Sequence, residues 1–142
     1  MSVQNQALAR RMFEDVWSTG NLDALDELLA PEFVGHPSGP EEEIRGPGGA
    51  KEFIGRMRES FPDLTFTVED QIAEGDTVVT RWIARGTHDG ELMGIDPTGR
   101  RAAVGGVTIQ RFRDGKIVEG WTSWDALGLL TQLGATPQPA RA

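Results

Sequence analysis

The chain has 142 residues, of which 38% are hydrophobic and 25% are charged, so it can form one domain around a single core. A net charge of −8 argues against nucleic acid or an anionic membrane surface as a partner. The absence of cysteine excludes disulfides, thiolate catalysis and cysteine-ligated metals, and it is compatible with a cytoplasmic location.

Cofactor and membrane signals are missing from the sequence. Two histidines cannot form a three-histidine metal site, and no H-x-E or H-E-x-x-H spacing favours a mixed one. The glycine-rich stretch Gly46–Lys51 lacks the spacing of a phosphate loop and predicts a helix start instead. We see no apolar run long enough to span a membrane and no basic-then-apolar signal sequence. We therefore expect no metal, no nucleotide or flavin cofactor, and a cytoplasmic protein.

The first half of the chain predicts three helices. Apolar residues at helical spacing mark the first one, which Gly20 ends: Leu8, Met12, Phe13, Val16 and Trp17. A second helix is predicted over 22–29, capped by Asn21, and a third over about 49–60, closed by Pro62. The intervening stretch 33–49 is rich in Gly, Pro and Glu and is typical of an irregular loop.

After Pro62 the apolar period changes to two. It predicts four strands, over about 64–74, 77–88, 102–113 and 116–125, joined by turns such as Asp114-Gly115. Three helices followed by an antiparallel meander indicate the α+β class, with helices covering one side of a curved sheet. We expect one domain over 1–136 and a flexible tail over 137–142.

The last strand carries the first candidate site residue, Asp125. Strict alternation puts one set of side chains on a shared face, namely Ile117, Trp121, Ser123 and Asp125, and leaves Val118, Thr122 and Trp124 on the other. Asp125 at the end of this strand has two possible roles. It is either an N-cap for the segment 126–133 or a proton-transfer group in a poorly solvated pocket.

Five stretches in order along the chain carry a family likeness: Phe61-Pro-Asp-Leu64, Gly86-Thr-His-Asp-Gly-Glu91, Gly94-Ile-Asp-Pro-Thr-Gly99, Phe112-Arg-Asp-Gly-Lys-Ile-Val-Glu119 and Trp124-Asp-Ala-Leu-Gly-Leu-Leu-Thr-Gln-Leu-Gly134. With the N-terminal helices, the chain resembles the SnoaL-like polyketide (ester) cyclases, within the nuclear-transport-factor-2-like superfamily. The resemblance implies a cone-shaped α+β barrel with an apolar pocket between helices and sheet.

The resemblance also implies a reaction: cofactor-independent ring closure by an intramolecular aldol-type step on a small apolar carbonyl compound. It places the acid/base aspartate on Asp125 and pocket histidines on His36 and His88. Burial beside an indole would raise the pKa of Asp125 toward the working pH, and His88 would donate a hydrogen bond to the developing enolate. The other expected substrate-binding residues are Phe33, Trp82, Met93, Trp121 and Ser123.

Several observations limit the reaction class. The chain has no tyrosine, so the oxyanion holes of ketosteroid isomerases and of scytalone-dehydratase-like sites cannot be built in their usual form. Gly105-Gly106 stands where an active cyclase is expected to have bulkier or polar pocket residues. The rival interpretation is a non-catalytic protein that binds a small apolar molecule in the same cavity.

Two further expectations concern faces of the sheet. We expect Trp82 and Asp125 to lie on the same face, toward the pocket. Relatives of this fold usually pair through the outer face, which predicts a homodimer that covers Val79, Ile83, Val118 and Trp124.

Overall fold

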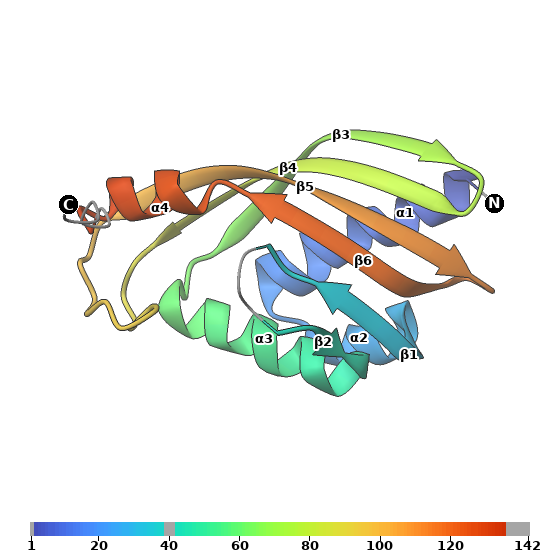
Figure 1. Ribbon diagram of the computed structural model, residues 1–142, viewed down its shortest axis with the longest axis horizontal. Helices are drawn as coiled ribbons and strands as arrows, with labels where there is room; N and C mark the ends of the chain where they lie inside the picture. Colours follow the sequence, from blue (N-terminus) through green and yellow to red (C-terminus); the bar gives the residue numbers. More distant parts are fainter. Residues whose placement is uncertain (1, 39–41, 136–142) are drawn as a thin grey trace, which may run out of the picture.

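The computed structural model describes residues 2–38 and 42–135 and has the α+β architecture that the sequence predicts. Its helical segments run in chain order as α1 (Ser2–Arg11), the π-helical turn η1 (Met12–Trp17), the 3-10 turn η2 (Leu22–Ala24), α2 (Leu25–Leu28), α3 (Gly46–Ser60) and α4 (Ala126–Gln132). Helices α1, α2 and α3 lie along one side of the curved sheet, and α4 lies at the end away from the start of α1 (Figure 1).

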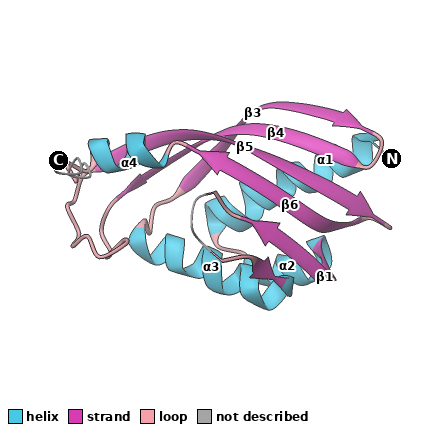
Figure 2. Ribbon diagram, viewed as in Figure 1, coloured by secondary structure: helices cyan, strands magenta, loops and turns pink. Residues whose placement is uncertain are grey.

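The sheet has six strands, in the order β2-β1-β6-β5-β4-β3 (Figure 2). Their bounds are β1 (Leu29–His36), β2 (Ile44–Arg45), β3 (Thr65–Glu74), β4 (Thr77–Thr87), β5 (Arg101–Arg113) and β6 (Lys116–Trp124). All neighbouring strands pair antiparallel except β1 and β6, which pair parallel. The four predicted strands form β3 to β6, so the predicted count of four was too low by β1 and β2.

Strand β1 lies where the sequence predicts the end of a helix and the start of a loop. Pro31, Gly35 and Pro37 within or beside it weaken its strand pattern. Its ladder partner is a strand near the other end of the chain, with His36 opposite Trp121. A local sequence pattern does not report such a distant partner, which explains the missed strand.

One apolar core connects the helical layer to the inner face of the sheet. Its fully buried members include Val16, Leu25, Leu28, Leu29, Ile54, Val78 and Ile117. Strand β4 follows the predicted alternation, because Val78, Thr80, Trp82 and Ala84 are buried. Within the described residues, no helix combines the length and the apolar character needed to cross a bilayer. The tail predicted over 137–142 lies outside the described residues.

A β-bulge at Val118 reverses the alternation of β6. Phe112 pairs with Ile117 and Arg111 pairs with Glu119, so Val118 has no partner in the ladder. An extra residue shifts every later side chain to the opposite face. Ile117 is therefore buried as predicted, but the face assigned to the residues beyond Val118 was wrong.

Candidate active-site cavity

A cavity of about 200 Å³ lies between the helices and the inner face of the sheet. Most of its wall is apolar, with contributions from Met12, Phe13, Trp17, Phe33, Ile54, Met57, Phe61, Phe66, Trp82, Leu92, Val104, Trp124 and Leu129. Such an apolar cavity with a few polar groups is the usual form of a small-molecule site.

Two cross-strand rows place the polar groups of the cavity. In the first row Thr122 of β6 lies opposite Thr108 of β5. In the second row Gly120 of β6 lies opposite Gln110 of β5. All four residues line the cavity. The inner face of β5 thus carries the polar residues Thr108 and Gln110, both almost fully buried.

Hydrogen bonds connect the first of these rows to Trp82. The indole Nε1–H of Trp82 donates to Thr108 Oγ1 at 2.9 Å. The Thr108 and Thr122 hydroxyl oxygens are 3.1 Å apart and share a second hydrogen bond. The amide oxygen of Gln110, by contrast, is buried and has no hydrogen-bond partner among the described residues.

Gly106 explains how Trp82 fits into this wall. It lies opposite both Trp82 and Trp124 in the sheet. A Cβ on Gly106 would lie 2.3 Å from an atom of the Trp82 indole, which no real contact allows. The indole therefore fills the space that a side chain at Gly106 would take. Its neighbour Gly105 faces away and meets only a backbone oxygen at 3.8 Å.

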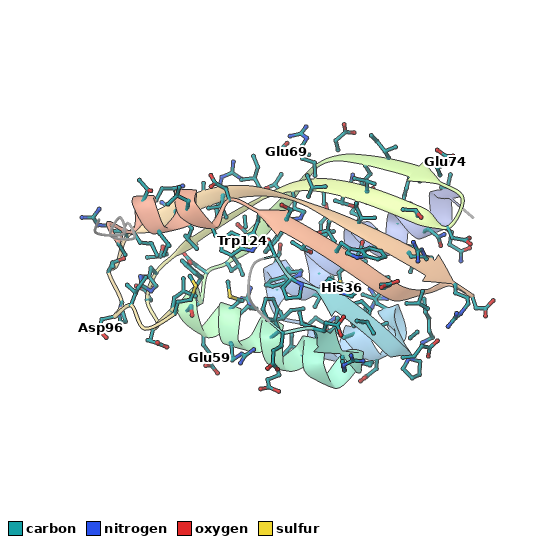
Figure 3. The ribbon with its side chains drawn as sticks, in the orientation of Figure 1. His36, Glu59, Glu69, Glu74, Asp96 and Trp124 are labelled. Atoms are coloured by element: carbon teal, nitrogen blue, oxygen red, sulfur yellow. The ribbon has the colours of Figure 1, made fainter. Side chains whose placement is uncertain are left out.

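Four of the predicted substrate-binding residues border the cavity: Phe33, His36, Trp82 and Met93. The His36 ring itself stacks on Trp121, with ring centroids 5.4 Å apart, and contacts Glu119 at 2.8 Å and Glu43 at 3.2 Å. Figure 3 shows His36 near the end of β1 and Trp124 near the end of β6, the two strands that meet in the parallel pair.

Trp121 and Ser123 do not border the cavity. The bulge at Val118 turns both toward the outer face, opposite Ile109 and Val107 of β5. Trp121 there lies between His36 and the guanidinium of Arg111, which is 5.1 Å from its ring centroid. The inner tryptophan of β6 is Trp124, which sequence alternation assigned to the outer face and to the dimer contact.

Asp125 is exposed and caps α4. Its carboxylate accepts a hydrogen bond from the Gly128 backbone N–H at 2.8 Å, as an N-cap does. The carboxylate therefore does not share a face with the Trp82 side chain, and the expected burial beside Trp121 was wrong. The neighbours of Asp125 in sequence nevertheless reach the cavity, through Trp124 on one side and Leu129 of α4 on the other.

His88 is fully buried but is not among the residues that border the cavity. The Thr98 backbone N–H donates to its Nδ1 at 3.2 Å, and Nδ1 also lies 3.0 Å from Thr98 Oγ1, whereas its buried Nε2 has no hydrogen-bond partner among the described residues. Its backbone bonds to Arg100 and Gly99, and its ring packs 5.6 Å from Phe61, which does line the cavity. The structure therefore brings neither Asp125 nor His88 into direct contact with the cavity, nor with each other.

Sequence reasoning missed Thr108, Gln110, Thr122 and Trp124 as cavity residues. The available signal was the alternation of Thr108 and Gln110 with the exposed Val107 and Ile109, in which polar residues face inward. In the described part of the chain, no group of three or more His, Asp or Glu residues is placed to hold a metal ion.

A family profile, relatives of known sequence and solved structures all match nearly the whole chain to the same family. The family profile described as SnoaL-like polyketide cyclase matches residues 7–133. The chain is 33% identical over 120 residues to the nogalonic acid methyl ester cyclase of Streptomyces nogalater, covering 83% of this chain and 89% of that one. It is 30% identical over 129 residues to the aklanonic acid methyl ester cyclase AcmA of Streptomyces galilaeus, covering 90% and 89%. A solved SnoaL-like polyketide cyclase candidate from Jannaschia sp. CCS1 superposes with a TM-score of 0.87, at 30% identity over 96% of this chain and 95% of that one.

Proposed function

Because the chain belongs to the SnoaL-like polyketide cyclase family, we propose that it closes a ring in a polyketide methyl ester by an intramolecular aldol addition. The resemblance inferred from the sequence is confirmed, and the protein is an enzyme of the SnoaL-like cyclase type. Its curated relatives are named as cyclases, which favours catalysis over the binding-only alternative.

The observation that carries the proposal is the apolar cavity with hydrogen-bonding groups on its sheet wall. Aromatic side chains such as Trp82, Trp124 and Phe61 suit the flat rings of an aromatic polyketide. Removal of a proton α to one carbonyl gives an enolate whose carbon attacks a second carbonyl. The C–C bond forms as that carbonyl becomes an alkoxide, which then takes back the proton. The product has the mass of the substrate.

Asp125 is the proposed base. Its first oxygen, Oδ1, is held by the Gly128 N–H, which fixes the orientation of the carboxylate. It follows Trp124 in the chain and its backbone C=O accepts the Leu129 N–H, and both of these neighbours border the cavity. We propose that a substrate longer than the cavity reaches past Trp124 and presents its α carbon to the exposed carboxylate. General acid–base assistance of this kind contributes about 10² to 10⁴-fold.

Asp125→Asn separates the two roles of this residue. An asparagine side chain also accepts the Gly128 N–H, so it keeps the cap, but it cannot take a proton. We expect Asp125→Asn to lower kcat by about 10² to 10⁴-fold at an unchanged melting temperature. Asp125→Ala should lose activity and also about 1 kcal/mol of stability. The substrates to assay are nogalonic and aklanonic acid methyl esters, with the isomeric product separated by chromatography. Full activity of Asp125→Asn would show that Asp125 is not the base and serves only as the N-cap of α4.

For His88 we propose a positioning role in place of direct hydrogen bonding to the enolate. It is bonded through Nδ1 to Thr98 and through its backbone to Gly99 and Arg100. These contacts anchor the loop over 91–99, which brings Leu92 and Met93 to the cavity. His88→Ala should therefore raise KM more than it lowers kcat and speed amide exchange within 91–99. If His88→Ala lowered kcat but left KM and the amide exchange of residues 91–99 unchanged, His88 would instead donate directly to the enolate.

Assembly and location remain proposals as well. We propose a homodimer that covers the outer face of the sheet, where Ile72, Val107 and Ile109 are exposed. We propose a cytoplasmic location, with which a chain without cysteine is compatible. Light scattering at micromolar concentration tests the homodimer, and the Ile109→Glu variant should be monomeric in that measurement. A monomeric parent protein would contradict the dimer.

A further inference from the structure

The first observation is that the hydrogen-bond donors on the sheet wall of the cavity outnumber the hydrogen bonds that they form. The Trp82 indole N–H and the hydroxyls of Thr108 and Thr122 have three donor protons in total, but only two hydrogen bonds connect these three groups. Those two bonds use two protons. One hydroxyl proton is left over, and the described residues offer it no acceptor within hydrogen-bonding distance. Since Thr108 already accepts from Trp82, its hydroxyl is polarised into a better donor.

The second observation is Gln110, two residues along β5 on the same face. Its side chain is 4% exposed, and its Oε1 is buried without a partner among the described residues. A buried acceptor of this kind costs free energy unless it is hydrogen-bonded. The residue opposite on β6 is Gly120, so no side chain of β6 stands between the amide and the cavity. Neighbours two apart on a strand are about 7 Å apart.

A spare donor and a spare acceptor therefore lie in adjacent rows of an otherwise apolar wall. We infer that Thr108, Thr122 and Gln110 form a substrate-positioning subsite for an enolised dicarbonyl or a hydroxy-carbonyl group. The threonine pair donates to the carbonyl oxygen, and Gln110 Oε1 accepts from the neighbouring enol or phenol hydroxyl. In its catalytic meaning this inference rests on the proposed function, because the same threonine donor would stabilise the enolate oxygen.

The subsite also gives a role to the close approach of Trp82 and Gly106. Among the described residues, the Thr108 hydroxyl is hydrogen-bonded to Trp82 and Thr122, and the Trp82 indole reaches it by lying over Gly106. The absence of a side chain at Gly106 thus orients the donor. The two glycines that the sequence set against cyclase chemistry then have different roles, since Gly105 faces the outside.

Simple bicyclic probes test the subsite without requiring turnover. Naphthalene has no hydrogen-bonding group, 1-tetralone has only an acceptor, and 1-naphthol has a donor. Thr108→Val/Thr122→Val removes both hydroxyls, because either hydroxyl alone would keep a spare proton; it should raise the Kd of 1-tetralone by about 3- to 10-fold, the worth of one neutral hydrogen bond, and leave the other two within about 2-fold. Gln110→Met should do the same to 1-naphthol alone. Equilibrium dialysis measures all three.

Two control variants keep the result interpretable. Thr108→Ser/Thr122→Ser keeps both hydroxyls and should keep 1-tetralone binding. Thr80→Val makes the same change in the next threonine of the row, which is buried away from the cavity wall and bonded to Gln71, and it should leave all three Kd values unchanged. Melting temperatures report whether each variant folds.

Different outcomes separate this inference from the proposed function. Equal effects of Thr108→Val/Thr122→Val on all three probes, no effect on any, or failure of the parent protein to bind 1-tetralone and 1-naphthol would overturn the subsite. Loss of 1-tetralone rather than 1-naphthol binding in Gln110→Met would overturn its acceptor role. Probe selectivity as expected in a protein that turns over neither methyl ester would support the subsite and contradict the cyclase reaction.

Discussion

The two faces of β6 each carry a tryptophan, yet the two residues have opposite surroundings. Trp124 lines the cavity beside Gly106, whereas Trp121 lies outside, stacked between His36 and Arg111. Both indoles are partly buried, so burial alone does not distinguish them. The difference shows that the register of the strand, and not the residue type, decides which tryptophan faces the cavity.

The inner and outer faces also differ in how they use polar groups. On the inner face Trp82, Thr108 and Thr122 are bonded to each other in a place with little water. On the outer face Arg111 forms an ion pair with Glu119 that solvent reaches, and the same carboxylate contacts the His36 ring. Hydrogen bonds of the first kind are costly to break, and ion pairs of the second kind contribute little.

The largest expected contrast concerns isoleucines on the two faces. Ile117 is fully buried in the core, and Ile109 on the outer face of β5 is 38% exposed. Ile117→Ala should lower the free energy of unfolding by about 2–5 kcal/mol, and Ile109→Ala by less than about 1 kcal/mol. Denaturant titrations of the two variants measure this. Similar losses would mean that the outer face is as closely covered as the core.

A second contrast uses the adjacent glycines. Gly106→Ala forces the Trp82 indole to move, because the new Cβ would lie 2.3 Å from it, and should cost about 1–3 kcal/mol. It should also weaken 1-tetralone binding, since Trp82 orients Thr108. Gly105→Ala meets no close atom and should stay within about 0.5 kcal/mol of the parent. Thermal melts and dialysis on both variants check the pair, and indistinguishable variants would refute the assigned faces.

The smallest contrast is at the solvent-exposed end of β4. The Asp63 carboxylate accepts the backbone N–H of Thr87 at 2.7 Å and its hydroxyl at 2.8 Å, and these hydrogen bonds lower the pKa of Asp63. A lowered folded-state pKa adds stability above the unfolded value of 3.8, and that stability is lost as pH falls through the folded value.

Asp63→Asn should therefore cost less than about 1 kcal/mol at pH 7, and the difference from the parent should shrink below about pH 4. Asp96→Asn, in an exposed loop, is the matched control, because it removes the same charge at another exposed site. Denaturant midpoints at pH 7 and pH 3 supply the comparison. A gap that stays constant between the two pH values would exclude the carboxylate as its cause.

The sequence predicted the fold class because the strongest patterns were local. The alternation from Val78 to Ala84 reports a strand with one buried face, and it was correct in every residue. Strand β1 was missed because Pro31, Gly35 and the following Pro37 are typical of a loop. Its pairing with β6 joins residues that are far apart in the sequence. No local property of Leu29–His36 reveals that partner.

The site was predicted only in part, and one residue explains most of the error. Alternation counted from Ile117 is correct up to the bulge at Val118 and reversed beyond it. Trp121, Ser123 and Asp125 were therefore assigned inward, and Trp124 outward. The cap role of Asp125, by contrast, follows from a short-range rule, and the sequence contained it. Phe33, Trp82 and Met93, which were predicted to bind substrate, border the cavity.

The parallel pair of β1 and β6 sets an order of events during synthesis. Strand β1 is made before α3 and β3 to β5, and its ladder partner β6 follows all of them. Until β6 is made, β1 has no β6 edge to pair with, and the apolar residues of β1 and α2 that pack against β6 stay accessible to chaperones and to other nascent chains. Closure of this pair joins distant parts of the chain and is slow by its topology. The part of the cavity wall that β6 contributes, with Gly120, Thr122 and Trp124, is therefore in place only after translation of β6.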